Sequence, residues 1–464
     1  MRDPEKPSNA GRNALVVIVL LIVVAGVVAL LRGGPPQITA TRWPAAVGRQ
    51  ARLDLAVHAD MGVRAVRVFY RQHGRVIDVA RAGFPGRHLY FAPSAQREIH
   101  LSPVIGRQQV KGLADGPAEL VVQARAGNLL GSAVETSHAV TIRSVPPRIE
   151  VLSTRQYVHQ GGAEMVVYRV VEPGDSGAPS GVASGVEMAG KLYPGYPVPG
   201  AAPGVMFCLF AFPYNAPSGS VPRLVARDDA GNQAVVGFPA SLFATKFRTR
   251  TFAIDDAFIA RVVVPIIANT PALADSGTPL QQFLLVNRAL RRTDARELAE
   301  ASGQSAHQFL WHGAFLALAH ATVEADFADH RLYKYDGKIV DQEDHLGYDL
   351  AVVRHTPVLA ANDGRVLWAH YFGIYGNAIL IDHGFGLMSL YAHLNDFAIK
   401  PGDLVKRGQL IAHSDSTGLA GGDHLHFSML LDGVQVNPME WWDPHWVHDR
   451  IESKLAAVGA NPMP

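Results

Sequence analysis

Two histidines stand one residue apart near the end of the chain, in the segment GGDHLHFSMLLDG at residues 421–433. Alternate side chains of an extended strand share a face, so His424 and His426 point to one side while Leu425 and Phe427 point to the other. Two adjacent imidazoles pack poorly in a core, but they can hold a metal ion and transfer a proton. For this segment alone, a solvated histidine pair on an edge strand is the alternative interpretation.

Further candidate ligands lie upstream, in the segment DHLGYDLA, where His345 precedes Asp349 by four residues and Gly347 between them permits a turn. A histidine, a carboxylate and one histidine of the downstream pair would give three protein ligands and one open position, as in a catalytic zinc site. Because Cys208 is the only cysteine, any metal must be held by His, Asp or Glu.

The motifs around these residues resemble the catalytic domain of the lysostaphin and LytM-type zinc metalloendopeptidases, the peptidase family M23. His-x-x-x-Asp at 345–349 is followed by Tyr-Ala-His-Leu at 391–394 and by Ser-Thr-Gly with His-Leu-His-Phe, all in order within roughly a quarter of the chain. The resemblance implies a Zn²⁺ cofactor with three ligands and two further catalytic histidines. The implied metal ligands are His345, Asp349 and His426, and the implied catalytic histidines are His393 and His424. Which of the latter two is the general base stays open.

The resemblance also implies an activity, the hydrolysis of peptide cross-links between peptidoglycan stem peptides by a zinc-activated water that attacks the scissile carbonyl. The bond cleaved, either between D-Ala and a diamino acid or in a glycine-rich bridge, stays open. The alternative is a non-catalytic scaffold or activator of other cell-wall hydrolases. Family members of that kind have lost ligands or catalytic histidines, whereas this chain retains all five, which favours an enzyme. The chain contains no His-Glu-x-x-His motif, which excludes a thermolysin-like protease.

One departure from the family pattern precedes the first ligand. Family members usually carry Phe-Gly-x-Arg there, whereas this chain has Phe327 followed by Ala328, with Arg331 one place late. We therefore expect an altered first strand and an altered wall of the cleft, with the ligand set intact.

The elements that must position these residues are mainly β. Segments of alternating apolar and polar residues, punctuated by Gly and Pro, predict two β-sandwich modules at residues 35–145 and 146–245. The sequence PPQI at Pro35 returns as PPRI at Pro146, a weak internal repeat. The second module resembles bacterial immunoglobulin-like domains through the AGN that ends at Asn232.

A helical connector is expected at residues 246–322, where Thr278 precedes Pro279 as a cap and Thr293 can cap a second helix. We expect it to pack against the domain that follows; a lid over the site is the alternative. The peptidase-like domain, an antiparallel β-sheet, is expected at 323–443, and a C-terminal tail at 444–464.

The N-terminal residues 1–34 contain an uninterrupted apolar run at 14–31. As a helix it would extend about 27 Å, enough to cross a bilayer. The polar leader before it carries Arg2, Lys6 and Arg12, which favours a cytoplasmic N-terminus and an inner-membrane anchor with the bulk of the chain in the periplasm or otherwise outside the cytoplasm. A cleaved signal peptide is the alternative. The absence of a nearby cysteine excludes a lipoprotein.

The overall charge is balanced, with 42 basic and 41 acidic residues and a formal net charge of +1. This balance does not point to a nucleic-acid partner. A protein regulator or partner could bind through the β modules, while the oligomeric state stays open.

Overall fold

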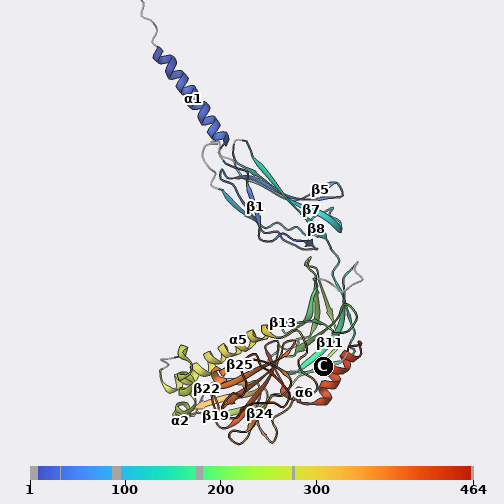
Figure 1. Cartoon of the computed structure of the whole chain (residues 1–464), viewed down its shortest axis with the longest axis vertical. Coiled ribbons are helices and arrows are strands. Elements are labelled where there is room, and N and C mark those ends of the chain that lie inside the picture. The colour runs from blue at the N-terminus through green and yellow to red at the C-terminus, as the bar shows by residue number, and fades with distance from the viewer. Residues whose placement is uncertain are drawn as a thin grey trace, which may run out of the picture. The chain divides into compact units, whose positions relative to one another are not determined.

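The computed structural model describes residues 9–31, 33–85, 96–128, 130–173, 181–273 and 277–460 (Figure 1). Strands predominate over helices, which confirms the mainly β prediction. The chain divides into two compact units. The first comprises Met1–Pro147 with Arg227–Gln233, and the second comprises Arg148–Ala226 with Ala234–Pro464.

The first helix, α1 (Asn9–Leu31), covers the apolar run near the N-terminus. Its segment Gly11–Val28 has a mean hydropathy of 2.5, and none of it is buried against the rest of the chain. A helix of this length and composition can serve as a membrane anchor or as a signal sequence.

The rest of the first unit is built from two sheets around one core. The smaller sheet has the order β1 (Gln37–Ala40), β3 (Leu55–His58), β6 (Glu98–Leu101). The larger has the order β2 (Ala46–Val47), β8 (Ala133–Ile142), β7 (Gly116–Ala126), β4 (Val63–Gln72), β5 (Arg75–Gly83). Both sheets contribute to the core, for example Val57 from β3 and Tyr70 from β4. The immunoglobulin-like character of this module remains a prediction.

The second unit opens with a further β module of three small sheets. They have the orders β14 (Tyr196–Pro197), β15 (Val205–Ala211), β11 (Ala163–Val171), β9 (Arg148–Val151); β13 (Lys191–Pro194), β12 (Ala183–Met188), β16 (Arg223–Arg227), β17 (Gln233–Gly237); and β10 (Gln156–His159), β18 (Ala240–Phe243). The repeated Pro-Pro sequences have a common place, because PPQI leads into β1 and PPRI leads into β9. Immunoglobulin-like character again remains a prediction.

The connector is not helical throughout, because it begins with strand β19 (Thr249–Ala253), which pairs in parallel with β21 (Asp329–Tyr335). Its helical part consists of α2 (Asp256–Phe258), η1 (Ile259–Val263), α3 (Val264–Ala268), η2 (Pro271–Leu273), α4 (Pro279–Leu284), η3 (Leu285–Leu290), α5 (Arg291–Ala301) and η4 (Ser302–Gln304). Thr278 caps α4 in a capping box with Gln281, as its position before Pro279 predicted.

The predicted cap at Thr293 is wrong. Helical structure runs without a break from Pro279 to Ala301, with Thr293 inside α5. Phe283, Val286 and Leu290 are buried in one core along this run. Packing of this apolar stripe continues the helix through a residue that could otherwise have begun a new one.

The C-terminal part of the second unit is built around an antiparallel sheet, with two smaller sheets beside it. The main sheet has the order β20 (Thr322–Ala325), β23 (Tyr348–Ala351), β30 (His424–Leu431), β27 (Leu387–Leu394), β26 (Asn377–Gly384), β25 (Gly364–Tyr371), β28 (Leu404–Val405), and β31 (Val434–Val436) also pairs with β30. The smaller sheets are β19, β21, β22 (Lys338–His345) and β24 (Pro357–Leu359), β29 (Leu410–His413). The turn η5 (Gly373–Tyr375) precedes β26, and α6 (Pro438–Trp442), α7 (Pro444–Val447), η6 (His448–Glu452) and α8 (Ser453–Ala456) follow the sheet.

The main sheet is covered on both faces. Because side chains alternate along β30, successive residues of this strand pack into the two different cores. Leu425 and Phe427 belong to the core that contains Trp441 of α6. Leu430 belongs to the core that contains Phe283 of the connector. His424 and His426 have the parity of Leu430, so they lie on the face that the connector covers, the face along which α5 is drawn in Figure 1.

Candidate active site

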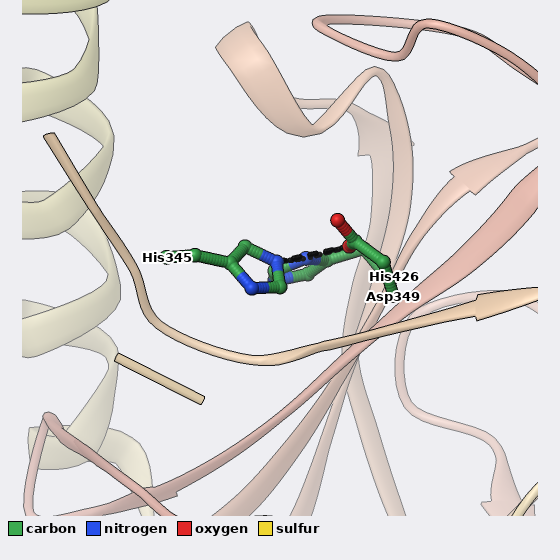
Figure 2. Close-up of side chains that lie close together, drawn as sticks. All are labelled: His345, Asp349 and His426. Carbon is green, nitrogen blue, oxygen red and sulfur yellow. Dashed lines mark hydrogen bonds and ion pairs between the residues drawn. The ribbon is translucent and has the colours of Figure 1, made fainter. Parts of the chain in front are cut away.

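The register of the sheet brings the candidate ligands together. Asp349 in β23 lies directly opposite His426 in β30. His345 is the last residue of β22, and a two-residue link, Leu346 and Gly347, connects it to β23. Backbone pairing therefore fixes two of the candidate ligands, and the short link holds the third beside them. Figure 2 shows the three side chains close together.

Three donor atoms from these side chains form a small triangle. His345 Nε2 lies 2.9 Å from Asp349 Oδ1 and 3.0 Å from His426 Nδ1, and the third edge is also 3.0 Å. Ligands at zinc–nitrogen distances around a tetrahedral ion are about 3.3 Å apart, so the triangle is close to the size that Zn²⁺ requires. All three residues are buried, at 5–7% exposure.

The hydrogen bonds of the ring nitrogens that point away from the triangle show which nitrogen of His345 and of His426 carries the proton. His345 Nδ1 donates to the carbonyl of Asp326, 3.0 Å away. His426 Nε2 donates to Ser428 Oγ at 2.9 Å, because that hydroxyl itself donates to the carbonyl of Leu346. The inner nitrogens, His345 Nε2 and His426 Nδ1, then carry no proton. Their lone pairs point at each other and at the carboxylate of Asp349, which is unfavourable unless a cation lies among them. The donor set therefore fits a metal ion.

The other two histidines adjoin this triangle. His393 and His424 have ring centroids 4.7 Å apart, and His424 Nε2 lies 3.4 Å from Asp349 Oδ1. Their Nδ1 atoms donate to the carbonyls of Thr417 and Gly422, at 2.7 and 2.9 Å. With Nδ1 carrying a proton in each ring, Nε2 is the nitrogen that can gain or lose a proton.

His393 reaches the site through a break in its strand. The side chain of Ala392 lies on the connector face, so strict alternation in β27 would place the side chain of His393 on the other face of the sheet. Its backbone φ of 60° lies in the left-handed region and interrupts that alternation. Such a conformation is costly in a strand, and residues in it cluster at functional sites.

Burial and mutual repulsion set the charges of these groups. Burial, the largest cause, lowers the pKa of His426 to about 4, so its ring is neutral at pH 7. Burial and then the neighbouring histidines lower the pKa of His393 well below its ordinary value. Burial alone would raise the pKa of Asp349, but the histidines, His345 foremost, hold it well below the usual range. Burial lowers the pKa of His424, yet contact with Asp349 outweighs it and the pKa is raised.

These residues line one cavity of about 390 Å³, and connector residues form much of its wall. The connector residues that line it are Arg250, Phe252, Ala253, Ile254, Phe258, Arg291, Arg292 and Ala295. Gly421 and Gly422 lie on the wall next to His424. The cavity is more apolar than polar in its lining and is large enough for a short peptide segment.

Two supporting residues were not predicted from the sequence. Ser428, which fixes the proton of His426, is two residues further along the same strand, so the alternation that paired His424 with His426 could have revealed it. Arg331 donates from Nη2 to Asp349 Oδ2 at 2.6 Å; only its displacement from the family pattern had drawn attention to it. Ala328, where the family has Gly, has a φ of 60°.

Gly347 lies at a bend in the link between β22 and β23, as predicted, although its φ is not in the left-handed region. A Cβ at this position would lie 2.6 Å from His426 Nε2 and 2.6 Å from Ser428 Oγ. Glycine is therefore also required there by close packing against His426 and Ser428.

Comparison with known proteins identifies the domain that carries this geometry. The model of peptidase family M23 matches residues 343–438. A DD-carboxypeptidase/endopeptidase of Neisseria meningitidis serogroup B is 41% identical over 95 residues, which are 20% of this chain and 22% of the relative. A peptidoglycan DD-endopeptidase of Vibrio cholerae is 34% identical over 118 residues, 25% of this chain and 27% of the relative. The matched region thus spans about a quarter of the length of these relatives.

Solved structures also align with the chain. A zinc-containing peptidase from Vibrio cholerae covers 70% of this chain and 81% of its own, with a TM-score of 0.26 and 15% identity. The catalytic domain of lysostaphin from Staphylococcus simulans covers 31% of this chain and 96% of its own, with a TM-score of 0.21 and 24% identity.

Proposed function

Residues 343–438 form a peptidase family M23 domain, and from this premise we propose that the chain is a zinc metalloendopeptidase that hydrolyses peptide cross-links of peptidoglycan. One observation carries the proposal: three buried donor atoms form a triangle of 2.9–3.0 Å, beside two histidines whose Nδ1 atoms donate to backbone carbonyls. A non-catalytic scaffold would need the triangle of metal-binding atoms at most. The presence of the two further histidines beside it therefore favours an enzyme.

His345 Nε2, Asp349 Oδ1 and His426 Nδ1 would hold the metal. Bound there, Zn²⁺ would polarise the scissile carbonyl and acidify a water molecule. The low pKa of Asp349 and the neutral ring of His426 keep both ligands free of protons at neutral pH, which favours metal binding.

His393 and His424 act on protons and on the substrate carbonyl. The carbonyls of Thr417 and Gly422 fix each ring with its Nε2 directed inward. One Nε2 can take a proton from the attacking water, and the other ring, once protonated, can stabilise the negative oxygen that develops on the carbonyl. The contact of His424 with Asp349 favours its charged form and suits it to the second task.

The substrate proposal draws on the relatives. Two of the relatives that match this region are named a DD-carboxypeptidase/endopeptidase and a peptidoglycan DD-endopeptidase. We extend this to the present chain, with a D-Ala bond in the cross-link as the substrate. Helix α1 would anchor the protein in the inner membrane, with the β modules and the peptidase domain outside the cytoplasm.

The test is digestion of purified, cross-linked peptidoglycan by the full-length chain in detergent, followed by mass spectrometry of the released muropeptides. We expect new uncross-linked stem peptides whose termini identify the cleaved bond. Zinc chelation, His426→Ala and His424→Ala should each abolish them, but only His424→Ala should retain stoichiometric zinc. A zinc-loaded, folded wild type that leaves every cross-link intact would contradict the proposed activity and favour the scaffold.

A further inference from the structure

Arg331 lies outside the triangle formed by His345, Asp349 and His426, and its guanidinium contacts the proposed ligand Asp349. It lies on β21, its side chain is 19% exposed, and its Nη2 is 2.6 Å from Asp349 Oδ2. The other oxygen of this carboxylate, Oδ1, lies 2.9 Å from His345 Nε2 and 3.0 Å from His426 Nδ1. The two oxygens therefore have different partners: Oδ1 belongs to the triangle and Oδ2 to the guanidinium.

We propose that Arg331 is a positioning residue for the metal centre, which holds Asp349 in the orientation that presents Oδ1 alone to the metal. This inference rests on the proposed zinc site. A carboxylate can bind through one or both oxygens, and a charge-assisted hydrogen bond to one of them selects the first mode. With Oδ2 occupied by Arg331, the open coordination position remains available for the reaction.

The guanidinium is itself held by the connector. Arg331 lies over the ring of Phe252 in β19, 5.3 Å from guanidinium carbon to ring centroid. Strand β19 pairs in parallel with β21, and Arg250 is opposite Arg331 in this register. Tyr333, on the same face of β21 as Arg331, has its ring centroid 6.2 Å from that of Phe252. A segment that precedes the family domain thus contributes to the orientation of a proposed metal ligand.

The side chain also lines the cavity, and its Nε is buried without a hydrogen-bond partner among the described residues. A competing role follows from this, in which Arg331 binds a carboxylate of the substrate. The two roles predict different measurements, since loss of a substrate contact raises KM and loss of a ligand's support weakens metal binding.

The experiment measures zinc Kd for the full-length chain in detergent by competition with a chelating dye, without substrate. We expect Arg331→Met to weaken zinc binding about 10- to 100-fold, as losses of hydrogen-bonding partners of metal ligands do. Arg331→Lys, which keeps a charge that can reach Oδ2, should restore most of the affinity. The matched control is Arg296→Met on α5, whose exposed side chain pairs with Glu300, and its Kd should stay within about twofold of wild type.

A Co²⁺-loaded sample gives a second readout. If Asp349 rotates and binds through both oxygens in Arg331→Met, the coordination number rises and the visible absorption of the ion weakens relative to wild type. A zinc Kd for Arg331→Met within about twofold of wild type, with an unchanged Co²⁺ spectrum, would overturn the inference, and an accompanying rise in KM would assign Arg331 to the substrate instead. If Arg331→Met does not fold, Arg331→Gln is judged by the same criteria. Because neither readout needs turnover, a wild type that binds zinc and cleaves nothing would refute the proposed function and still decide this inference.

Discussion

At the scale of single residues, the site is defined by where its protons are held. Each of the four histidines has one ring nitrogen bonded to an oxygen acceptor, and in each case that acceptor lies in a loop link or on the same strand. These acceptors fix both tautomer and ring orientation before a metal or a substrate binds. The site therefore depends on close packing of neighbours that carry no chemistry themselves.

Gly347 is the sharpest test of that packing. Gly347→Ala would place a methyl group 2.6 Å from His426 Nε2 and Ser428 Oγ, so the ring or the link must shift. We expect zinc affinity to fall at least about tenfold, because the bond that fixes the His426 proton is broken. The measurement is zinc Kd, with Gly237→Ala as control, since that glycine has open space around it and no positive φ. A Gly347→Ala variant with wild-type zinc affinity would contradict this account.

At the scale of elements, the connector is part of the domain it precedes. Arg288 in η3 pairs with Asp341 in β22 at 2.9 Å, and Asn287 donates to the same carboxylate at 2.9 Å. In α5, Asp294 accepts from the backbone N–H of Ile374 in η5 at 2.9 Å. These bonds join the connector to the strand that ends in His345 and to a turn that lines the cavity.

We therefore expect Asp294→Ala to destabilise the fold. Asp294 is 2% exposed, and its loss leaves the Ile374 N–H buried without a partner. The free energy of unfolding should fall by about 1–3 kcal/mol. Denaturant titration is the measurement, and Arg296→Ala is the control on the same helix, at an exposed position where the change should stay within about 0.5 kcal/mol. Equal effects of the two substitutions would mean that α5 is not docked through Asp294.

At the scale of the whole molecule, the second β module and the C-terminal helices share buried polar contacts. Lys454 of α8, whose side chain is 10% exposed, donates to the fully buried Glu164 of β11 at 2.7 Å. Glu440 of α6 accepts from the backbone N–H of Ala163 at 2.7 Å. These contacts lie within the second unit and give that unit a stability that depends on pH.

Glu440 sets the sign of one part of this dependence. Burial, the largest cause, raises the pKa of Glu440 to about 8 from an ordinary value of 4.5. Between these values the native state binds more protons than the unfolded state, so the stability from this group is present below pH 4.5 and is lost as pH rises through 8. Glu440→Gln stays neutral, so its Tm relative to wild type should be several degrees higher at pH 8.5 than at pH 5, by ~2–4 °C per kcal/mol. A difference in Tm that is the same at both pH values would contradict the prediction; Glu187→Gln, at an exposed position of β12, is the control.

The proposed anchor makes a prediction for the complete chain. If α1 spans the inner membrane, the protein should stay in the membrane fraction after washing with high salt or alkaline carbonate and should be released by detergent. Deletion of residues 14–31 should abolish this retention, because no other described helix is long and apolar enough to span a bilayer. N-terminal sequencing of the mature protein distinguishes the two interpretations of α1, since a cleaved signal sequence would leave a new terminus after the apolar run.

The sequence by itself determined what depends on short-range order. Alternation in a strand placed His424 and His426 on one face, and four-residue spacing with a matching family pattern identified His345 and Asp349 as ligand candidates. The apolar run at 14–31 and the capping pair at Thr278 were likewise legible, because each depends on neighbouring residues alone. Only the tertiary structure decided the contact of Arg331 with Asp349, the left-handed backbone of His393, the close packing of Gly347 against His426, and the continuation of α5 past Thr293. Each of these depends on packing or register between segments distant in the chain, and such contacts override local preference without leaving a signal in the residues nearby.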